Sequence, residues 1–301
     1  MTVGNRFFVA AALLLMAIPV NMRAQDTALG FTRIDRNPRT SALAGAGMAS
    51  ARSSAYAAFG NAAQLGFLPG RGDVGLGVQL WEMSNEVDKT TNFNAAAGFR
   101  FGHFALALGG AYQMGVPQGF FTPADGLVSL GLAYNILDVV SVGVNARYAL
   151  QNLTQEYRIN GFSMDLSVMG RISPAVSVAV GVGTIGNAIA SSTGSSKQPA
   201  YLRCGAAWTL NPAPKHAVEL MLDAEYNFDG SFAADLGAEY DYNHTIYARV
   251  GYRYASRLAL IPSHLALGVG VRFAGFRAEV SYLTASPVLG NTLNLGVGYS
   301  F

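Results

Sequence analysis

A glycine-rich stretch is the first place where this chain could do chemistry. Residues 181–186 read Gly-Val-Gly-Thr-Ile-Gly, which matches the G-x-G-x-x-G pattern of dinucleotide-binding turns. That chemistry needs a helix directly after the glycines and an acidic residue about 20 positions later. Here a Ser/Gly-rich stretch follows instead, and the next acidic residue is Glu219. We therefore interpret the stretch as a strand end that runs into a loop, and we expect no cofactor.

The histidines are the other candidates for metal or acid–base chemistry. None stands at helical ligand spacing from another histidine or an acid, and the single Cys204 excludes a cysteine cluster. A hydrolase would need a nucleophile or a water-activating acid beside a histidine, and His264 with Ser256 and Ser263 comes nearest to that. Neighbours in sequence cannot form a triad by themselves. We predict neither a metal site nor an enzyme.

Charged residues between positions 219 and 279 alternate with large apolar ones, so they fall on one face of a strand. A charge facing lipid near mid-membrane costs roughly 2–4 kcal/mol, so this face belongs inside a barrel. Acids precede arginines along the chain, which would allow them to pair across neighbouring strands. We predict an ion-paired inner wall that anchors an N-terminal plug, rather than a selectivity filter, because opposite charges offset each other. The expected network comprises Asp235, Glu239, Arg249, Arg253, Arg272, Arg277 and Glu279.

The elements that must position these charges are strands. In the last eleven residues, 291–301, large apolar side chains occupy one parity and small or polar ones the other. Side chains alternate across a strand, and roughly 9–11 residues cross a bilayer as a tilted strand. Similar segments recur from Asp73 onward, about fourteen in all. Single-chain bacterial barrels have an even number of strands, so the count is compatible with closure.

Composition supports the same fold. Only 13% of residues are charged, against about 25% in soluble proteins, yet no apolar run after the N-terminus is long enough for a spanning helix. A closed barrel is the other structure that can cross lipid. We predict an all-β membrane protein, a roughly 14-stranded antiparallel barrel in the outer membrane of a Gram-negative cell. The net charge of +2 gives no reason to expect nucleic acid.

The predicted connections alternate between long and short, with one exception at Asp229-Gly230. Outer-membrane barrels have long outer loops and short periplasmic turns, so both termini are expected on the periplasmic side. Two long loops carry apolar residues, namely Phe120, Phe121, Leu258, Leu260 and Ile261. They could contact a partner or ligand, fold inward over the lumen, or dip into the outer leaflet.

The N-terminal region differs from the rest. Residues 1–24 have the charged start and apolar core of a signal peptide. Residues 25–70 are rich in Ala, Gly and Ser and do not alternate, although short helices are possible over 40–48 and 53–65. We predict that 25–70 forms a plug inside the barrel formed by 71–301; a flexible periplasmic lead-in is the alternative.

Two stretches resemble a known family. The first comprises residues 39–47, 54–56 and 60–65, and the second is the ending from Ser286 to Phe301. Both are similar to the PorV/PorQ family, which looks like a branch of the FadL-like barrels. Ala62 stands where that family has Pro, and Gln64 where it has Gly. The plug motif carried by the resemblance comprises Arg39, Leu43, Gly45, Gly47, Asn61, Ala62, Gln64 and Leu65.

The resemblance implies an outer-membrane component of the Bacteroidetes type IX secretion system, without enzymatic activity. Such a barrel would bind a secreted or surface-anchored partner protein through its outer loops and lumen. The alternative hypothesis is a FadL-like transporter of hydrophobic small molecules, which predicts an apolar lumen pocket near the plug. A general porin, the third hypothesis, would need an open lumen. In each case the outer surface is expected to contact outer-membrane lipid.

Overall fold

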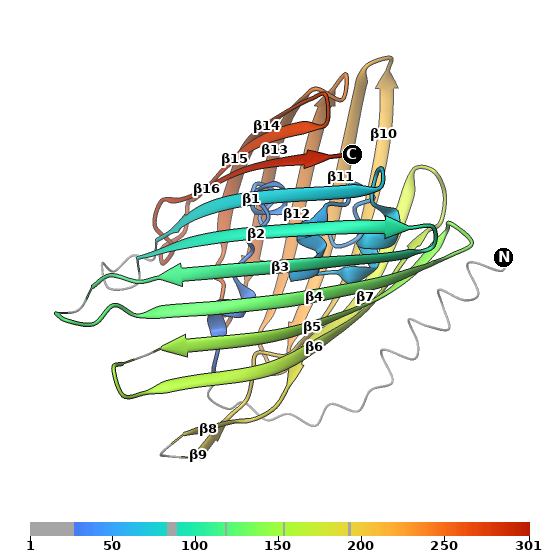
Figure 1. Cartoon of the computed structure of the whole chain (residues 1–301). Helices are drawn as coiled ribbons and strands as arrows, with labels where there is room; N and C mark the ends of the chain where they lie inside the picture. The colour runs from blue at the N-terminus through green and yellow to red at the C-terminus, as the bar shows by residue number, and fades with distance from the viewer. Residues whose placement is uncertain (1–26, 83–88, 118, 153, 192–193) are drawn as a thin grey trace.

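The computed structural model describes residues 27–82, 89–117, 119–152, 154–191 and 194–301. Fourteen of its strands form a closed antiparallel barrel, and two short strands pair outside it (Figure 1). The barrel strands are β1 (Gly72–Trp81), β2 (Thr90–Phe101), β3 (Phe104–Met114), β4 (Ala124–Ile136), β5 (Val140–Asn152), β6 (Arg158–Arg171), β7 (Val176–Gly186), β10 (Tyr201–Ala213), β11 (His216–Asn227), β12 (Phe232–Tyr242), β13 (Ile246–Ala255), β14 (His264–Phe273), β15 (Phe276–Thr284) and β16 (Thr292–Ser300). The short pair is β8 (Ile189–Ser191) and β9 (Gly194–Ser196).

The predicted fold class is therefore confirmed. β1 and β16 close the barrel, with Leu76 opposite Val297 and Asp73 opposite Ser300. One difference is the stretch expected as a loop over 184–199: β7 extends to Gly186, and the β8–β9 hairpin follows. The glycine-rich 181–186 stretch lies in β7, as its interpretation as a strand end requires.

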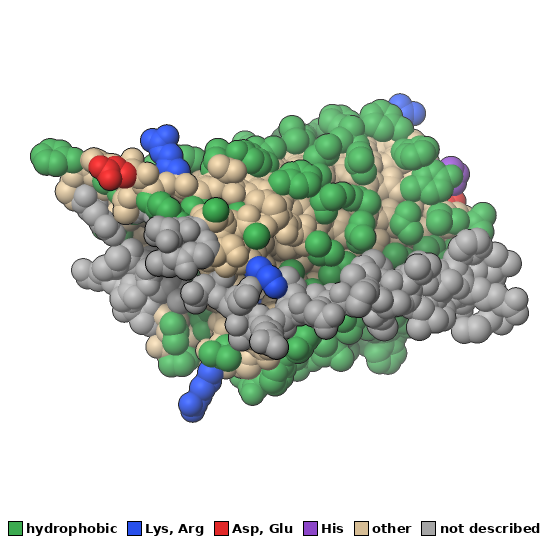
Figure 2. Space-filling view, turned by 90° about the horizontal axis from the view of Figure 1, so that it is seen from below, with side chains coloured by type: hydrophobic (Ala, Val, Ile, Leu, Met, Phe, Trp, Pro, Cys, Tyr) green, Lys and Arg blue, Asp and Glu red, His purple; other side chains and the backbone are tan. Residues whose placement is uncertain are grey.

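The outer face of the barrel is apolar. Leu76 and Val297 are 61% and 55% exposed, whereas their inward neighbours Asp73 and Gln79 are fully buried. Figure 2 shows hydrophobic side chains spread along the wall, with the acidic side chains in view near its two ends. Such a surface suits contact with lipid, and the closed barrel leaves no backbone edge unpaired there. No helix among the described residues is long and apolar enough to cross a membrane.

The two ends of the barrel differ. Turns of two to four residues join β2 to β3 and the other strand pairs at one end, where Phe301 also lies (Figure 1). Longer connections lie at the opposite end, and the exception predicted at Asp229-Gly230 falls in the four residues between β11 and β12. We call these ends the short-turn end and the long-loop end.

Residues 27–71, which we call the inner segment, lie within the barrel. Their elements are η1 (Gly30–Arg33), α2 (Pro38–Ser41), η2 (Ala55–Phe59) and η3 (Ala62–Phe67). Asn37 and Asn61 cap α2 and η3 by accepting the backbone N–H of Arg39 and Ala63. The helices are shorter than predicted, because glycines at 45, 47 and 60 interrupt the chain between them, two of them at positive φ.

The inner wall has two unlike halves. On β2 to β5 it consists largely of small residues, against which η2 and η3 pack: Ala96, Gly98, Ala105, Ala107, Gly109, Gly131, Ala133 and Gly143. On β10 to β15 it carries the charged residues that contact the loops of the inner segment. A helix can approach a sheet closely only where the sheet side chains are small, so the two halves hold different parts of the segment.

The inner segment runs from one end of the barrel to the other. Thr27 pairs with Lys197, next to the β8–β9 hairpin at the long-loop end, and the N–H of Ala28 donates to the Lys197 carbonyl at 2.9 Å. Arg71 lies at the short-turn end, where its N–H donates to the Phe301 carbonyl. The predicted signal peptide, residues 1–24, lies outside the described residues.

Candidate functional site

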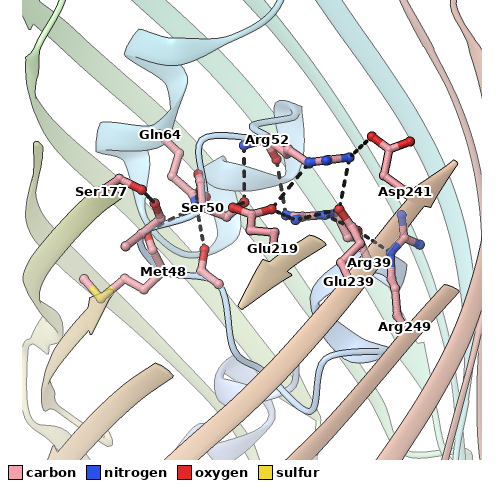
Figure 3. A network of polar contacts seen from close by, with 12 residues as sticks. Arg39, Met48, Ser50, Arg52, Gln64, Ser177, Glu219, Glu239, Asp241 and Arg249 are labelled. Carbon is pink, nitrogen blue, oxygen red and sulfur yellow. Dashed lines mark hydrogen bonds and ion pairs between the residues drawn. The ribbon is translucent and has the colours of Figure 1, made fainter. Parts of the chain in front are cut away.

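Arg39 is the centre of the contacts between the inner segment and the charged half of the wall (Figure 3). Its Nε and Nη2 lie 2.8 Å from carboxylate oxygens of Glu239 and Glu219, respectively. Both acids are completely buried. Burial alone would lower the pKa of the Arg39 guanidinium, but Glu239 and Glu219 hold it above its usual range. Arg39 thus bridges two buried carboxylates, and its Nε and Nη2 both donate to Glu239 in the bidentate arrangement that arginine favours.

Neighbouring residues extend this cluster. Arg52 contacts Asp241 at 2.9 Å, and the Ser50 hydroxyl donates to Glu219 at 2.8 Å. Within the wall, Arg249 lies 2.5 Å from Glu239 and 2.9 Å from Glu279. The cross-strand pairing expected for Arg249 therefore occurs, and the inner segment supplies further cations to the same acids.

A second set of contacts holds the turn at Gly47. Asp223 accepts the backbone N–H groups of Gly47 and Met48 at 3.0 and 2.9 Å. Arg203 bridges Asp223 and Asp235 at 2.8 and 2.9 Å. Because Gly47 has a φ of 122°, a side chain at this position would strain the turn that presents both N–H groups.

The other charged residues of the wall also form pairs. Arg253 contacts Asp235 at 2.8 Å and Glu225 at 3.1 Å, and Glu225 also accepts Arg33 of the inner segment at 2.7 Å. Arg277 pairs with Asp73 across the β1–β16 seam, and Asp73 accepts the N–H of Ala55 at 2.7 Å.

The plug-motif residues contact one another or the wall. Gln64 donates to the carbonyls of Gly47, Met48 and Ser50, and Asn61 donates to Met48 at 2.8 Å. The Gln64 amide therefore ties η3 to the glycine turn. The motif's apolar members are fully buried: Leu43, Ala62 and Leu65.

One sequence prediction needs correction. Arg272 was expected in the charge network, but no carboxylate of the described residues lies within ion-pair distance of it; it sits near the short-turn end, with its guanidinium 5.8 Å from the Tyr247 ring. Ile261 follows one of the three alternatives left open for the apolar loops, since it packs inward against the buried core. Phe120 and Leu258 are fully and 75% exposed, whereas Leu260 is 40% exposed and Phe121 is half-buried.

A cavity of about 160 Å³ lies between the inner segment and the wall. Its apolar lining includes Ile34, Phe59, Trp81, Ile261 and Leu283. Its charged lining consists of Arg33, Asp35, Arg36, Arg147, Asp165, Arg203, Glu225 and Arg253. The cavity thus combines an apolar surface with guanidinium groups, and nothing in the wall pattern alone predicted where it would lie.

Sequence reasoning missed several members of the site. Arg33, Arg52 and Arg203 were not assigned to the network, nor was the pair of Arg147 with Asp165 on β5 and β6. Their inward parity was a usable signal for the three strand residues. The histidines gather no metal ligands: no group of three His, Cys, Asp or Glu side chains suited to a metal occurs in the described part of the chain.

No protein-family model and no curated protein sequence matches the chain. Several solved structures are similar to the chain. One is the toluene transporter TbuX of Ralstonia pickettii, with 14% identity, coverage of 87% of this chain and 97% of that one, and a TM-score of 0.66. The CymD monoaromatic hydrocarbon channel gives 15% identity, coverage of 88% and 97%, and a TM-score of 0.66. A Pseudomonas aeruginosa FadL homologue has 10% identity, coverage of 88% of this chain and 98% of that one, and a TM-score of 0.59. These likenesses show the fold: the chain is a multi-pass β-barrel of the outer-membrane type.

Proposed function

We propose that this chain is an outer-membrane channel for hydrophobic small molecules, in which residues 25–70 act as a plug. The observation that carries the proposal is the partly apolar cavity between the inner segment and the wall. The similar structures support it, since TbuX is a toluene transporter and CymD is a monoaromatic hydrocarbon channel. The lumen charges do not oppose it, because most are matched by opposite charges that hold the inner segment in place.

Uptake of labelled toluene by Gram-negative cells that lack their own hydrocarbon channels tests this proposal. Expression of the chain is expected to raise the initial uptake rate, and Ile261→Arg to lower that gain at least fivefold, because the new side chain would occupy the cavity. Leu258→Arg is the matched control, since the same substitution in the same loop lies at an exposed position outside the cavity. Equal uptake in the two variants would argue against a route through the cavity.

The type IX secretion component is a second candidate. It rests on the exposed apolar side chains at the long-loop end, above all Phe120, which is fully exposed, and Leu258. A surface of this kind suits contact with a secreted or surface-anchored protein. The comparisons give this candidate less support than the channel, because no sequence family was found and the structural neighbours are named as transporters.

The double variant Phe120→Ser, Leu258→Ser tests this second candidate. If the loops bind a protein, its cross-linked complex with the chain in native outer membranes is expected to fall at least tenfold. Toluene uptake serves as the control and should not change, because neither side chain lines the cavity. An undiminished complex would remove these loops from any binding role.

A further inference from the structure

The cavity between the inner segment and the wall has a surplus of hydrogen-bond donors. Each of its five lining arginines has a side-chain nitrogen that is buried and has no partner among the described residues: Nη1 of Arg33, and Nε of Arg36, Arg147, Arg203 and Arg253. The unpaired acceptors of the lining are fewer, namely Asp35 Oδ2 and Gln79 Oε1, together with the Ser41 hydroxyl, which can donate or accept. Buried donors normally have acceptors, so this lining favours an acceptor-rich ligand.

The charges that face the cavity are also unequal. Its lining contains five arginines but only three acids, which are Asp35, Asp165 and Glu225. The acids that match Arg203, namely Asp223 and Asp235, stand behind it and do not line the cavity. A ligand in the cavity would therefore meet a surface with more positive than negative groups.

Arg36 is the arginine of this lining that has no ion pair. It is 1% exposed, and its Nη1 and Nη2 donate only to the carbonyls of Ile34 and Phe31, both at 2.9 Å, and more weakly to that of Thr32. No carboxylate of the described residues lies within ion-pair distance of it. Burial, with a smaller contribution from Arg147, lowers the pKa of the Arg36 guanidinium to about 10, although Asp35 and Asp125 act in the opposite direction, so it stays charged at neutral pH. A buried charge without a carboxylate in direct contact is costly, and an anionic ligand would reduce that cost.

Size and lining define the rest of the ligand. An engineered apolar cavity of about 150 Å³ in another protein holds one benzene molecule, and the cavity here measures about 160 Å³. Phe59, Trp81 and Leu283 offer it an apolar surface. We propose that the cavity binds a compact aromatic carboxylate, a single ring bearing one anionic group, and that Arg36 sets the preference for the anion. This inference rests on the proposed channel function and specifies its substrate class.

Benzoate and benzamide provide the matched pair of probes, since they share shape and differ in charge. Trp81 lines the cavity, so its fluorescence can report binding. The other tryptophan, Trp208, is exposed on the outer face, and Trp208→Phe removes its signal in all variants. Benzoate is expected to bind at least tenfold more tightly than benzamide. Arg36→Gln should weaken benzoate binding at least tenfold and leave benzamide unchanged, whereas Arg36→Lys, which keeps the charge, should retain the preference.

Arg272→Gln is the control, because Arg272 also lacks an ion pair among the described residues but does not line the cavity. Its benzoate affinity should equal that of the parent. Heat-modifiable migration of each variant on gels confirms that the barrel has folded. Equal affinities for the two probes, or an Arg36→Gln variant that binds benzoate as before, would overturn the inference. If the benzoate result fails but the parent chain still takes up toluene, the channel proposal stands without this substrate class. If the parent chain takes up no toluene, both the channel proposal and this inference fail.

Discussion

Replacing Arg39 with methionine is expected to unseat the middle of the inner segment and to open the bore to ions. The guanidinium lies 2.8 Å from both Glu219 and Glu239, and both carboxylates are fully buried. Removing one partner of a buried ion pair typically costs about 3–5 kcal/mol when the remaining charge is left alone in a medium that solvates it poorly. Here Arg249 still contacts Glu239 at 2.5 Å and Arg52 contacts Glu219 at 3.4 Å, so we expect a loss near the lower end of that range. Methionine preserves much of the side-chain length but supplies no charge. Single-channel recordings in planar bilayers should show conductance that the parent lacks, and the free energy of unfolding should fall.

Lys89→Met is the matched control for this experiment. Lys89 pairs with Glu82 at 3.4 Å, but both side chains are more than a third exposed. An exposed pair of this kind contributes about 0–1 kcal/mol, so neither stability nor conductance should change measurably. Silent bilayers and an unchanged unfolding midpoint for Arg39→Met would show that the segment is held by its packing and not by the charged half of the wall.

Gly143→Ala is expected to displace η3 from the opposite half of the wall. A Cβ at this position would lie 2.2 Å from the backbone nitrogen of Ala63 and 2.5 Å from the carbonyl carbon of Ala62. Backbone atoms cannot move aside as a flexible side chain can, so the helix must shift as a unit. Overpacking of this kind costs typically about 1–3 kcal/mol. Thermal unfolding in detergent micelles and limited proteolysis of the inner segment would measure the effect.

Gly126→Ala on β4 provides the comparison for this second variant. No atom lies within 4 Å of the site where its Cβ would stand, so the same substitution should be neutral or slightly stabilising. A similar loss of stability in both variants would mean that glycine matters to these strands for reasons other than the close approach of η3.

The strands could be predicted from the sequence because lipid imposes a demanding pattern on them. Each outward position of a strand such as β16 must be apolar, so Leu295 and Val297 mark its register without any knowledge of its neighbours. The pairing of Arg249 with Glu239 followed for the same reason, since both lie inward at opposed positions on adjacent strands.

The contents of the barrel could not be predicted in the same way. Small inward residues such as Ala105 and Ala133 are compatible with an open bore and with a packed interior, and alternation does not distinguish the two. The partner of Arg39 lies 200 positions away along the chain, a distance over which no periodic pattern carries information. Arg272 had the right parity but lies near a strand end, beyond the reach of the acids. Ile261 belongs to a loop, where parity has no meaning.

The pairing of Thr27 with Lys197 has a consequence for biogenesis. The inner segment runs through the barrel from the long-loop end to Arg71 at the short-turn end, before β1 begins. The earliest part of the described chain to be synthesised is therefore the part that ends up enclosed. The final strand, β16, closes the barrel by pairing with β1. If β1 and β16 pair after the inner segment is in place, some forty residues need not pass through a barrel that is already closed. We therefore expect the inner segment to take its position before the barrel closes.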